Sequence, residues 1–131
     1  MDMSVPGGGA QNRALMSLGE SIARIGRTAA DIYLTQAEKE KDIDGILAVM
    51  AQHRDSTEVQ SNGCAALGNV ARYNDANRRT IAEKGGIDVI LAGMKQHPDS
   101  MEVQRWGCFA LGNVGDGNDT NCRTIAEKGG I

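Results

Sequence analysis

The stretch DSMEVQRWGCFALGNV, from Asp99 to Val114, decides the fold because the chain contains a second, nearly identical copy of it. Its near-copy DSTEVQSNGCAALGNV runs from Asp55 to Val70, and the two are offset by 44 residues at every position without a gap. The units that surround them, residues 43–86 and 87–130, are identical at 31 of 44 positions. Self-similarity at a fixed period of this size predicts a solenoid of stacked units.

Composition places the chain among soluble globular proteins. Its 131 residues suffice for one domain with a modest core, and 24% of them are charged and 40% apolar. No apolar run approaches the ~18 to 20 residues that span a membrane, and the N-terminus lacks the pattern of a secretory signal. The net charge of −3 argues against a nucleic-acid surface. We therefore expect a cytoplasmic chain, with the nucleus as the alternative, and no membrane or nucleic-acid partner.

The residues that carry chemistry in enzymes form no catalytic or metal-binding pattern. Cys64 and Cys108 are equivalent positions of the two units, so we expect buried apolar fillers in a reducing compartment. Cys122 is expected at an ordinary surface or helix position, and no C-x-x-C pair suggests a metal site. His53 and His97 are also equivalents, and they are expected in a loop rather than as an acid–base pair. The sequence therefore predicts no enzyme, no metal and no cofactor.

The start of the long helix in each unit is indicated by a capping pattern. Asp55 precedes Glu58 by three residues, and the second unit repeats this spacing with Asp99 and Glu102. An acidic or hydroxyl residue followed by Glu at this distance is typical of a helix N-terminus. In the first unit we expect three helices, over residues 43–52, 56–70 and about 75–84.

Glycine positions indicate a close crossing and a sharp turn. Gly63 and Gly107 lie inside the long helices, where glycine costs about 1 kcal/mol relative to alanine, so we expect a close helix crossing there. Asn74 or Asp75 is the expected N-cap of the short helix. Gly85 is expected in the left-handed conformation just after that helix, which lets the chain turn into the next unit.

The segment before the regular units matches them only loosely. Residues 1–10 carry Pro6 and a run of three glycines, which predicts a disordered tail. Residues 11–42 are expected to form a degenerate capping repeat, with helices over residues 12–25 and about 29–41. Terminal units of a solenoid are expected to be atypical because one of their faces meets water.

The motif N-x-x-N-R-x-x-I-A-E-K-G-G-I, followed by E-V-Q-x-x-G-C-x-A-L-G-N-V, resembles the armadillo repeat. The resemblance covers residues 43–131. HEAT repeats are the near alternative, but they have two helices and lack this Gly-Gly turn. The resemblance implies an all-α fold: a right-handed α-solenoid (an armadillo-like superhelix) of three-helix repeats, here an incomplete array.

The resemblance also implies a binding surface. In the importin-α and β-catenin families, the third helices line a concave groove that holds extended peptides, and asparagines bond the peptide backbone. Asn69 and Asn113 match that asparagine. Ala65 and Phe109 match a position that is often tryptophan, four residues earlier. Both depart from it, and Ala65 offers no aromatic wall. Importin-like binding of basic signals is therefore not expected.

The differences between the two copies indicate where a partner would be selected. Ser61, Asn62 and Ala65 of the first copy become Arg105, Trp106 and Phe109 in the second. Trp106, Phe109 and Asn113 share one helix face, where aromatic rings would bury side chains and amides would bond a backbone. The alternative is that these side chains pack against, or bond to, a neighbouring unit. The predicted partner-binding residues are Asn62, Ala65, Asn69, Arg105, Trp106, Phe109 and Asn113.

Two interpretations of function remain. The first is a non-catalytic module that binds an extended segment of a partner protein in the groove of the third helices. The second is a regulatory or scaffolding fragment of a larger multidomain protein, with a catalytic domain beyond the C-terminus as one version.

Ile131 equals the first residue of each regular unit, so it is expected to begin a further, missing repeat. The apolar faces of the last unit would then lack cover, and we expect self-association through this end. The residues expected to be uncovered are Val103, Leu111, Val114 and Ile125.

Overall fold

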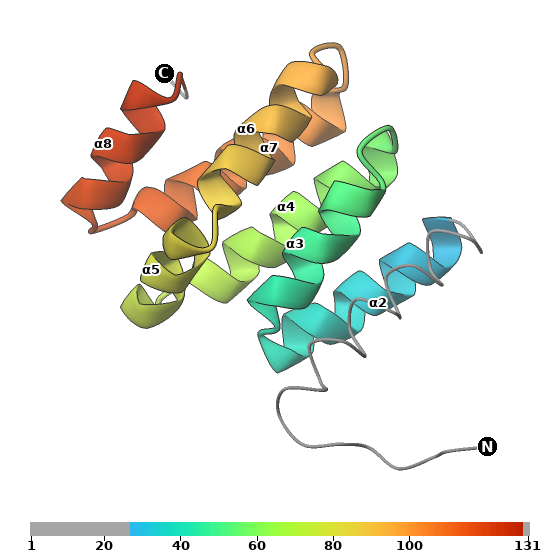
Figure 1. The fold of residues 1–131 in the computed structure, drawn as a ribbon, viewed down its shortest axis with the longest axis horizontal. Coiled ribbons are helices and arrows are strands. Elements are labelled where there is room, and N and C mark those ends of the chain that lie inside the picture. Colours follow the sequence, from blue (N-terminus) through green and yellow to red (C-terminus); the bar gives the residue numbers. More distant parts are fainter. Residues whose placement is uncertain (1–26, 130–131) are drawn as a thin grey trace.

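The protein is all-helical over residues 27–129, the part of the chain that the computed structural model describes (Figure 1). This range contains no strand, and the predicted all-α class is confirmed. The predicted tail over residues 1–10, the predicted helix over residues 12–25 and residue 131 lie outside the described residues. The helices are α2 Arg27–Glu40, α3 Ile43–Gln52, α4 Thr57–Ala71, α5 Asp75–Glu83, α6 Gly86–Gln96, α7 Met101–Gly115 and α8 Asp119–Glu127.

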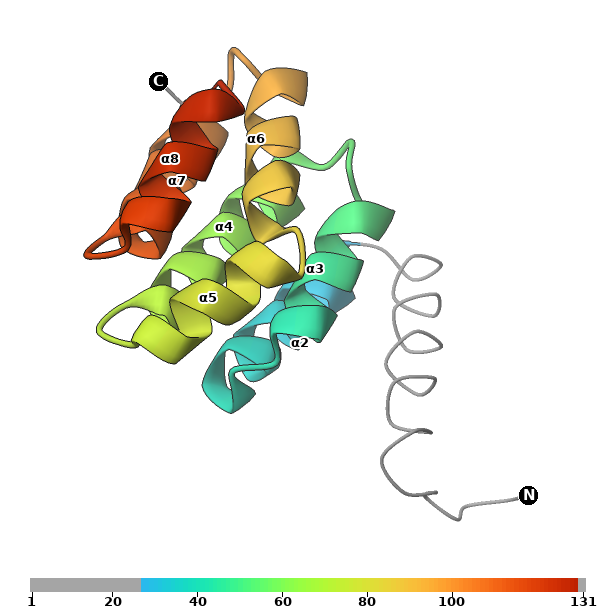
Figure 2. The same ribbon diagram turned by 60° about the vertical axis from the view of Figure 1, so that its left-hand side comes forward.

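The longer helices form two layers (Figures 1 and 2). One layer holds α2, α4 and α7 side by side, with α4 in the middle, and the other holds α3 and α6, which pack on α4 and α7 respectively. The short helix α5 connects the layers and contacts α4, α6 and α7, whereas α8 packs on α7. The helices α3, α4 and α5 have 10, 15 and 9 residues, and α6, α7 and α8 have 11, 15 and 9.

Serine, and not the aspartate before it, caps each long helix. The Oγ of Ser56 accepts a hydrogen bond from the backbone N–H of Val59, and Ser100 does the same with Val103. The prediction that Asp55 and Asp99 cap these helices is therefore wrong. The helices begin one residue later than the spacing suggested, and the serine side chain is then the one within reach of the third N–H.

The short helices and the turn behind α5 follow the predicted residues. Asn74 caps α5 by accepting from Asn77 N–H, and Asn118 caps α8 in the same way. Gly85 has a φ of +84°, so it occupies the left-handed region in which a side chain would be strained. The chain therefore turns from α5 into α6 at the predicted residue.

A buried glutamine in each long helix fixes the loop that precedes it. Gln60, 2% exposed, donates through Nε2 to the carbonyl oxygens of Met50 and His53, at 2.8 and 3.0 Å. Gln104 donates to the equivalent carbonyls of Met94 and His97, at 2.8 and 3.1 Å. These bonds satisfy carbonyl groups at the ends of α3 and α6 that have no partner within their own helix.

The expected close crossing at the helix glycines is present. A Cβ placed on Gly63 would overlap the side chain of Met50, and one on Gly107 would overlap that of Met94. The methionines belong to α3 and α6, so glycine lets each of these helices approach its long neighbour closely. The packing offsets the low helix propensity of glycine at these two positions.

The segment before the regular units contains one described helix, whereas each regular unit contains three. α2 begins two residues earlier than predicted, ends at Glu40 and joins α3 directly through Lys41, which has a φ of +55°. α2 lies along α4 on the side opposite α7 (Figure 1).

Equivalent cysteines do not share an environment. Cys64 is fully buried, and burial raises the pKa of its thiol to about 12. Cys108 is exposed, so the prediction that both are buried is wrong for Cys108. The reason is positional: α7 covers the face of α4 that carries Cys64, whereas none of the described helices covers the equivalent face of α7. Cys122 is exposed, as predicted.

The prediction that four apolar side chains of the last unit are uncovered is also wrong. The exposed fractions of Val103, Leu111, Val114 and Ile125 are 0%, 7%, 0% and 7%. They are buried within the described helices, where α7 contacts α4, α6 and α8.

Replacing the capping serine should lower stability, and replacing the aspartate should not. We expect Ser100→Ala to reduce the free energy of unfolding by about 1 kcal/mol, because Val103 N–H loses its acceptor. Asp99→Ala should stay within about 0.5 kcal/mol. Urea unfolding followed by circular dichroism measures both. An equal loss in the two variants would contradict the assigned cap.

Thiol labelling should separate the three cysteines. At neutral pH the folded protein should react with iodoacetamide at Cys108 and Cys122, because both are exposed. Cys64 should react only after unfolding, because it is buried and its raised pKa keeps it protonated. Mass spectrometry of the labelled peptides reads out each site, and labelling of Cys64 at the rate of Cys108 would contradict the burial.

Candidate protein-interaction surface

The predicted partner-binding residues come from two neighbouring helices. Asn62, Ala65 and Asn69 lie on α4, and the other four lie on α7. Asn62, Asn69 and Arg105 are exposed, and the remaining residues are partly buried. We call this set without Arg105 the groove surface: Asn62, Ala65, Asn69, Trp106, Phe109 and Asn113.

An aromatic pair forms the apolar part of the groove surface. The rings of Trp106 and Phe109 meet edge to face, with centroids 5.2 Å apart and an angle of 88° between the ring planes. Such a pair contributes about 0.5–1.5 kcal/mol beyond the area it buries, so each ring fixes the orientation of the other. Both rings keep part of their surface open to solvent, and a ligand therefore meets an ordered apolar surface.

Phe109 also holds α7 against α4. A Cβ placed on Gly68 would overlap the ring of Phe109 and would lie 3.3 Å from the Cα of Ala110. Glycine at position 68 therefore leaves the space that one edge of the ring fills. Phe109 both packs against the neighbouring unit and lines the groove surface.

The three asparagines are engaged within the chain through their amide nitrogens. Asn113 Nδ2 donates to the carbonyl oxygen of Gly68 at 3.1 Å. Asn62 Nδ2 donates to Asp31 Oδ1 at 2.9 Å, and Asn69 Nδ2 donates to Glu38 Oε2 at 3.2 Å. The amide oxygens of these side chains therefore remain to accept hydrogen bonds from a ligand, such as those of backbone N–H groups.

The carboxylates of α2 belong to the same surface, and the sequence did not indicate them. Asp31 and Glu38 are seven residues apart on α2, like their partners Asn62 and Asn69 on α4. Seven residues are two helical turns, so both contacts lie along one edge. Because α2 departs from the repeat pattern, its register against α4 could not be read from the sequence.

Arg105 lies beside the aromatic pair but is placed differently from it. The guanidinium carbon is 5.8 Å from the centroid of the Trp106 ring, within the range of a cation–π interaction. Its equivalent in the first unit, Ser61, is 5% exposed and donates to the carbonyl of Glu58. The two copies therefore differ at a position that is buried in the first unit and exposed in the second.

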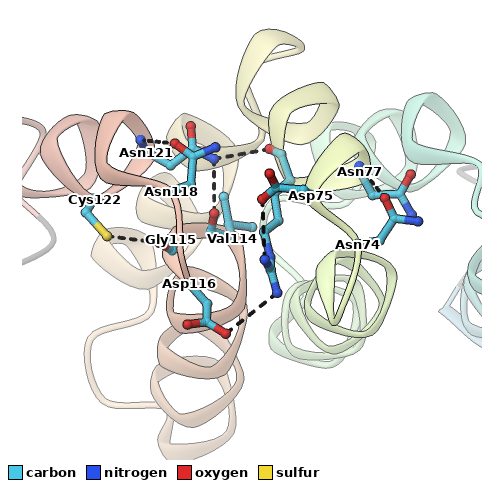
Figure 3. A network of polar contacts seen from close by, with 10 residues as sticks. Asn74, Asp75, Asn77, Val114, Gly115, Asp116, Asn118, Asn121 and Cys122 are labelled. Atoms are coloured by element: carbon cyan, nitrogen blue, oxygen red, sulfur yellow. Dashed lines mark hydrogen bonds and ion pairs between the residues drawn. The ribbon is translucent and has the colours of Figure 1, made fainter.

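Polar contacts at the other end of α7 fix its position against the first unit (Figure 3). Arg78, 9% exposed, forms ion pairs with Asp75 at 3.5 Å and with Asp116 at 3.6 Å. Asn121, 4% exposed, donates through Nδ2 to the carbonyl oxygens of Val114 and Arg78, at 3.0 and 3.3 Å. These bonds tie α5, α7 and α8 together and so hold the groove surface in register.

The two histidines lie at a loop, as predicted. The Nε2 of His97 is 2.7 Å from the carbonyl oxygen of Arg54 in the preceding unit, and Gln96 donates to Asp55 at 2.7 Å.

Among residues 27–129, no three His, Cys, Asp or Glu side chains are grouped as metal ligands. No helix in that range is long and apolar enough to cross a membrane.

Comparisons with family models, with curated proteins and with solved structures found no match to this chain.

Two equivalent glycines should respond in opposite ways to the same substitution. Gly68→Ala should destabilise the fold by about 1–3 kcal/mol, because the new methyl group displaces Phe109. Gly112→Ala should be neutral or stabilise by up to about 1 kcal/mol, because no atom of the described part of the chain lies within 4 Å of the added Cβ. Urea unfolding at low protein concentration measures both.

The same measurement can show that the clash with Phe109 causes the loss of stability in Gly68→Ala. In a Phe109→Ala background, Gly68→Ala should cost much less, and the difference is the coupling energy of the pair. An unchanged cost would mean that the Phe109 ring does not occupy the space beside Gly68.

Proposed function

We propose that the chain is a non-catalytic protein-interaction module that binds an extended segment of a partner protein along the groove surface. In this proposal the units form an armadillo-like right-handed solenoid, in which α4 and α7 are third helices of successive repeats. The observation that carries the proposal is the partly exposed, edge-to-face pair of Trp106 and Phe109 beside Asn113. The earlier copy has Asn62 and Ala65 at the two aromatic positions.

The chemistry of the surface favours a particular kind of segment. The aromatic pair offers a rigid apolar contact, which suits one large apolar side chain of the ligand. The amide oxygens of Asn69 and Asn113 can accept hydrogen bonds from backbone N–H groups, because their nitrogens already donate within the chain. An extended segment presents such groups at regular intervals, whereas a helix has them engaged internally.

Selection from a random peptide library tests the proposal. Peptides would be selected on the immobilised wild-type chain and measured by calorimetry. Trp106 is the only tryptophan of the protein, so its fluorescence reports contact directly. We expect bound peptides to shift this emission, and Trp106→Ala to weaken binding by about tenfold or more, as for an interface hot spot.

The control for this experiment is Met101→Ala. Met101 is 84% exposed on α7 and lies outside the groove surface, so peptide affinity should not change. Asn113→Ala should weaken binding while helical content, followed by circular dichroism, stays the same. Peptides that bind Trp106→Ala as tightly as the wild type would place the binding site elsewhere and contradict the proposal.

A further inference from the structure

The face of α7 that points away from α4 is open, although the same face of α4 is covered. Along α4, Ser61, Cys64 and Gly68 are buried beneath α7. Their equivalents on α7 are all exposed, and so are Met101 at one end of the stripe and Asp116 just past the other. We call this stripe the outer seam: Met101, Arg105, Cys108, Gly112 and Asp116.

An apolar hollow adjoins the outer seam where α7 meets α8. It has a volume of about 360 Å³, and its lining includes Leu111, Gly112, Cys122 and Ile125. The equivalent region of the first unit is filled by the ring of Phe109 on Gly68. The outer seam of α7 therefore resembles the face of α4 on which α7 packs.

Among residues 27–129, nothing packs against Gly112 in a way that requires glycine. A Cβ there would meet no atom of these residues within 4 Å, and glycine inside a helix costs about 1 kcal/mol relative to alanine. Its equivalent, Gly68, offsets that cost by admitting Phe109. A glycine in the middle of an exposed helix face allows the backbone of another helix to approach closely.

Arg105 occupies the position in the second unit that Ser61 occupies in the first. This difference argues that the outer seam is not covered by a helix in the way that α7 covers α4. A helix placed on α7 as α7 lies on α4 would bury the guanidinium where the hydroxyl of Ser61 is buried. Burying an unpaired charge is strongly unfavourable, so the covering element must bring a carboxylate to Arg105. The outer seam itself carries one, Asp116, whose side chain is 72% exposed.

A second copy meets this requirement. Arg105 and Asp116 are 11 residues apart, about 16 Å along the helix, with the small residues Cys108 and Gly112 between them. If two outer seams pack antiparallel about a two-fold axis between residues 110 and 111, each Arg105 faces Asp116 of the other copy. The pairing is self-complementary, as an isologous interface requires. We propose that the protein forms a symmetric dimer through the outer seam of α7.

Analytical ultracentrifugation of the whole chain over a roughly thousandfold range of concentration tests the dimer. The wild type should pass from the monomer mass to twice that mass. Gly112→Gln should weaken the association at least about tenfold, because its side chain occupies the crossing point and has open space in the monomer. Ala92→Gln, at an exposed position on α6, is the matched control and should leave the association unchanged.

Charge reversal tests the antiparallel pairing itself. Arg105→Glu and Asp116→Arg should each weaken the dimer at least about tenfold, since each places like charges opposite one another. The double variant should restore it. Because Asp116 also pairs with Arg78, thermal unfolding must show that each variant is folded.

Three results would overturn the proposal. They are a monomer at every concentration, a dimer or open-ended assembly that Gly112→Gln does not weaken, and a double charge reversal that fails to restore association in folded protein.

Discussion

The seating of Phe109 on Gly68 is the contact on which the arrangement of the long helices depends. The ring occupies the space that a side chain at position 68 would need, and Asn113 bonds the carbonyl of the same glycine. One residue of α4 therefore fixes α7 through a ring and an amide that lie four residues apart. Both groups also line the groove surface. One edge of the Phe109 ring and the amide nitrogen of Asn113 are therefore already engaged within the chain and are not fully available to a ligand.

Most helix boundaries could be predicted because their signals are local. Asn74 acts on an N–H three residues away and Gly85 acts at its own position, and the structure places both as expected. The capping of α4 could not be decided in this way. Asp55 and Ser56 are both good caps, and the choice depends on which side chain the backbone brings within reach of Val59 N–H.

The sequence allowed candidate site residues to be chosen, but it did not show which residues they contact. Comparing the two copies located the aromatic pair, since Trp106 and Phe109 are unlike the residues they replace. It could not show that Asn69 meets Glu38, because the register of α2 against α4 is set by packing between non-repeated segments. Nor could it separate Cys64 from Cys108, since identical residues differ in burial when, within residues 27–129, a helix covers one of them and not the other.

The two opposite faces of α7 explain why duplication alone does not determine what the chain binds. Its inner face packs on α4 and carries the aromatic pair, so in the proposed module it serves both stacking and recognition. Its outer face keeps Cys108 and Gly112 from the shared pattern but places Arg105 where a buried serine stood. A charge at that position disfavours packing of another helix on α7 in the orientation in which α7 packs on α4, because the charge would be buried without a partner. In the proposed dimer, the second copy supplies the carboxylate that Arg105 needs, through Asp116.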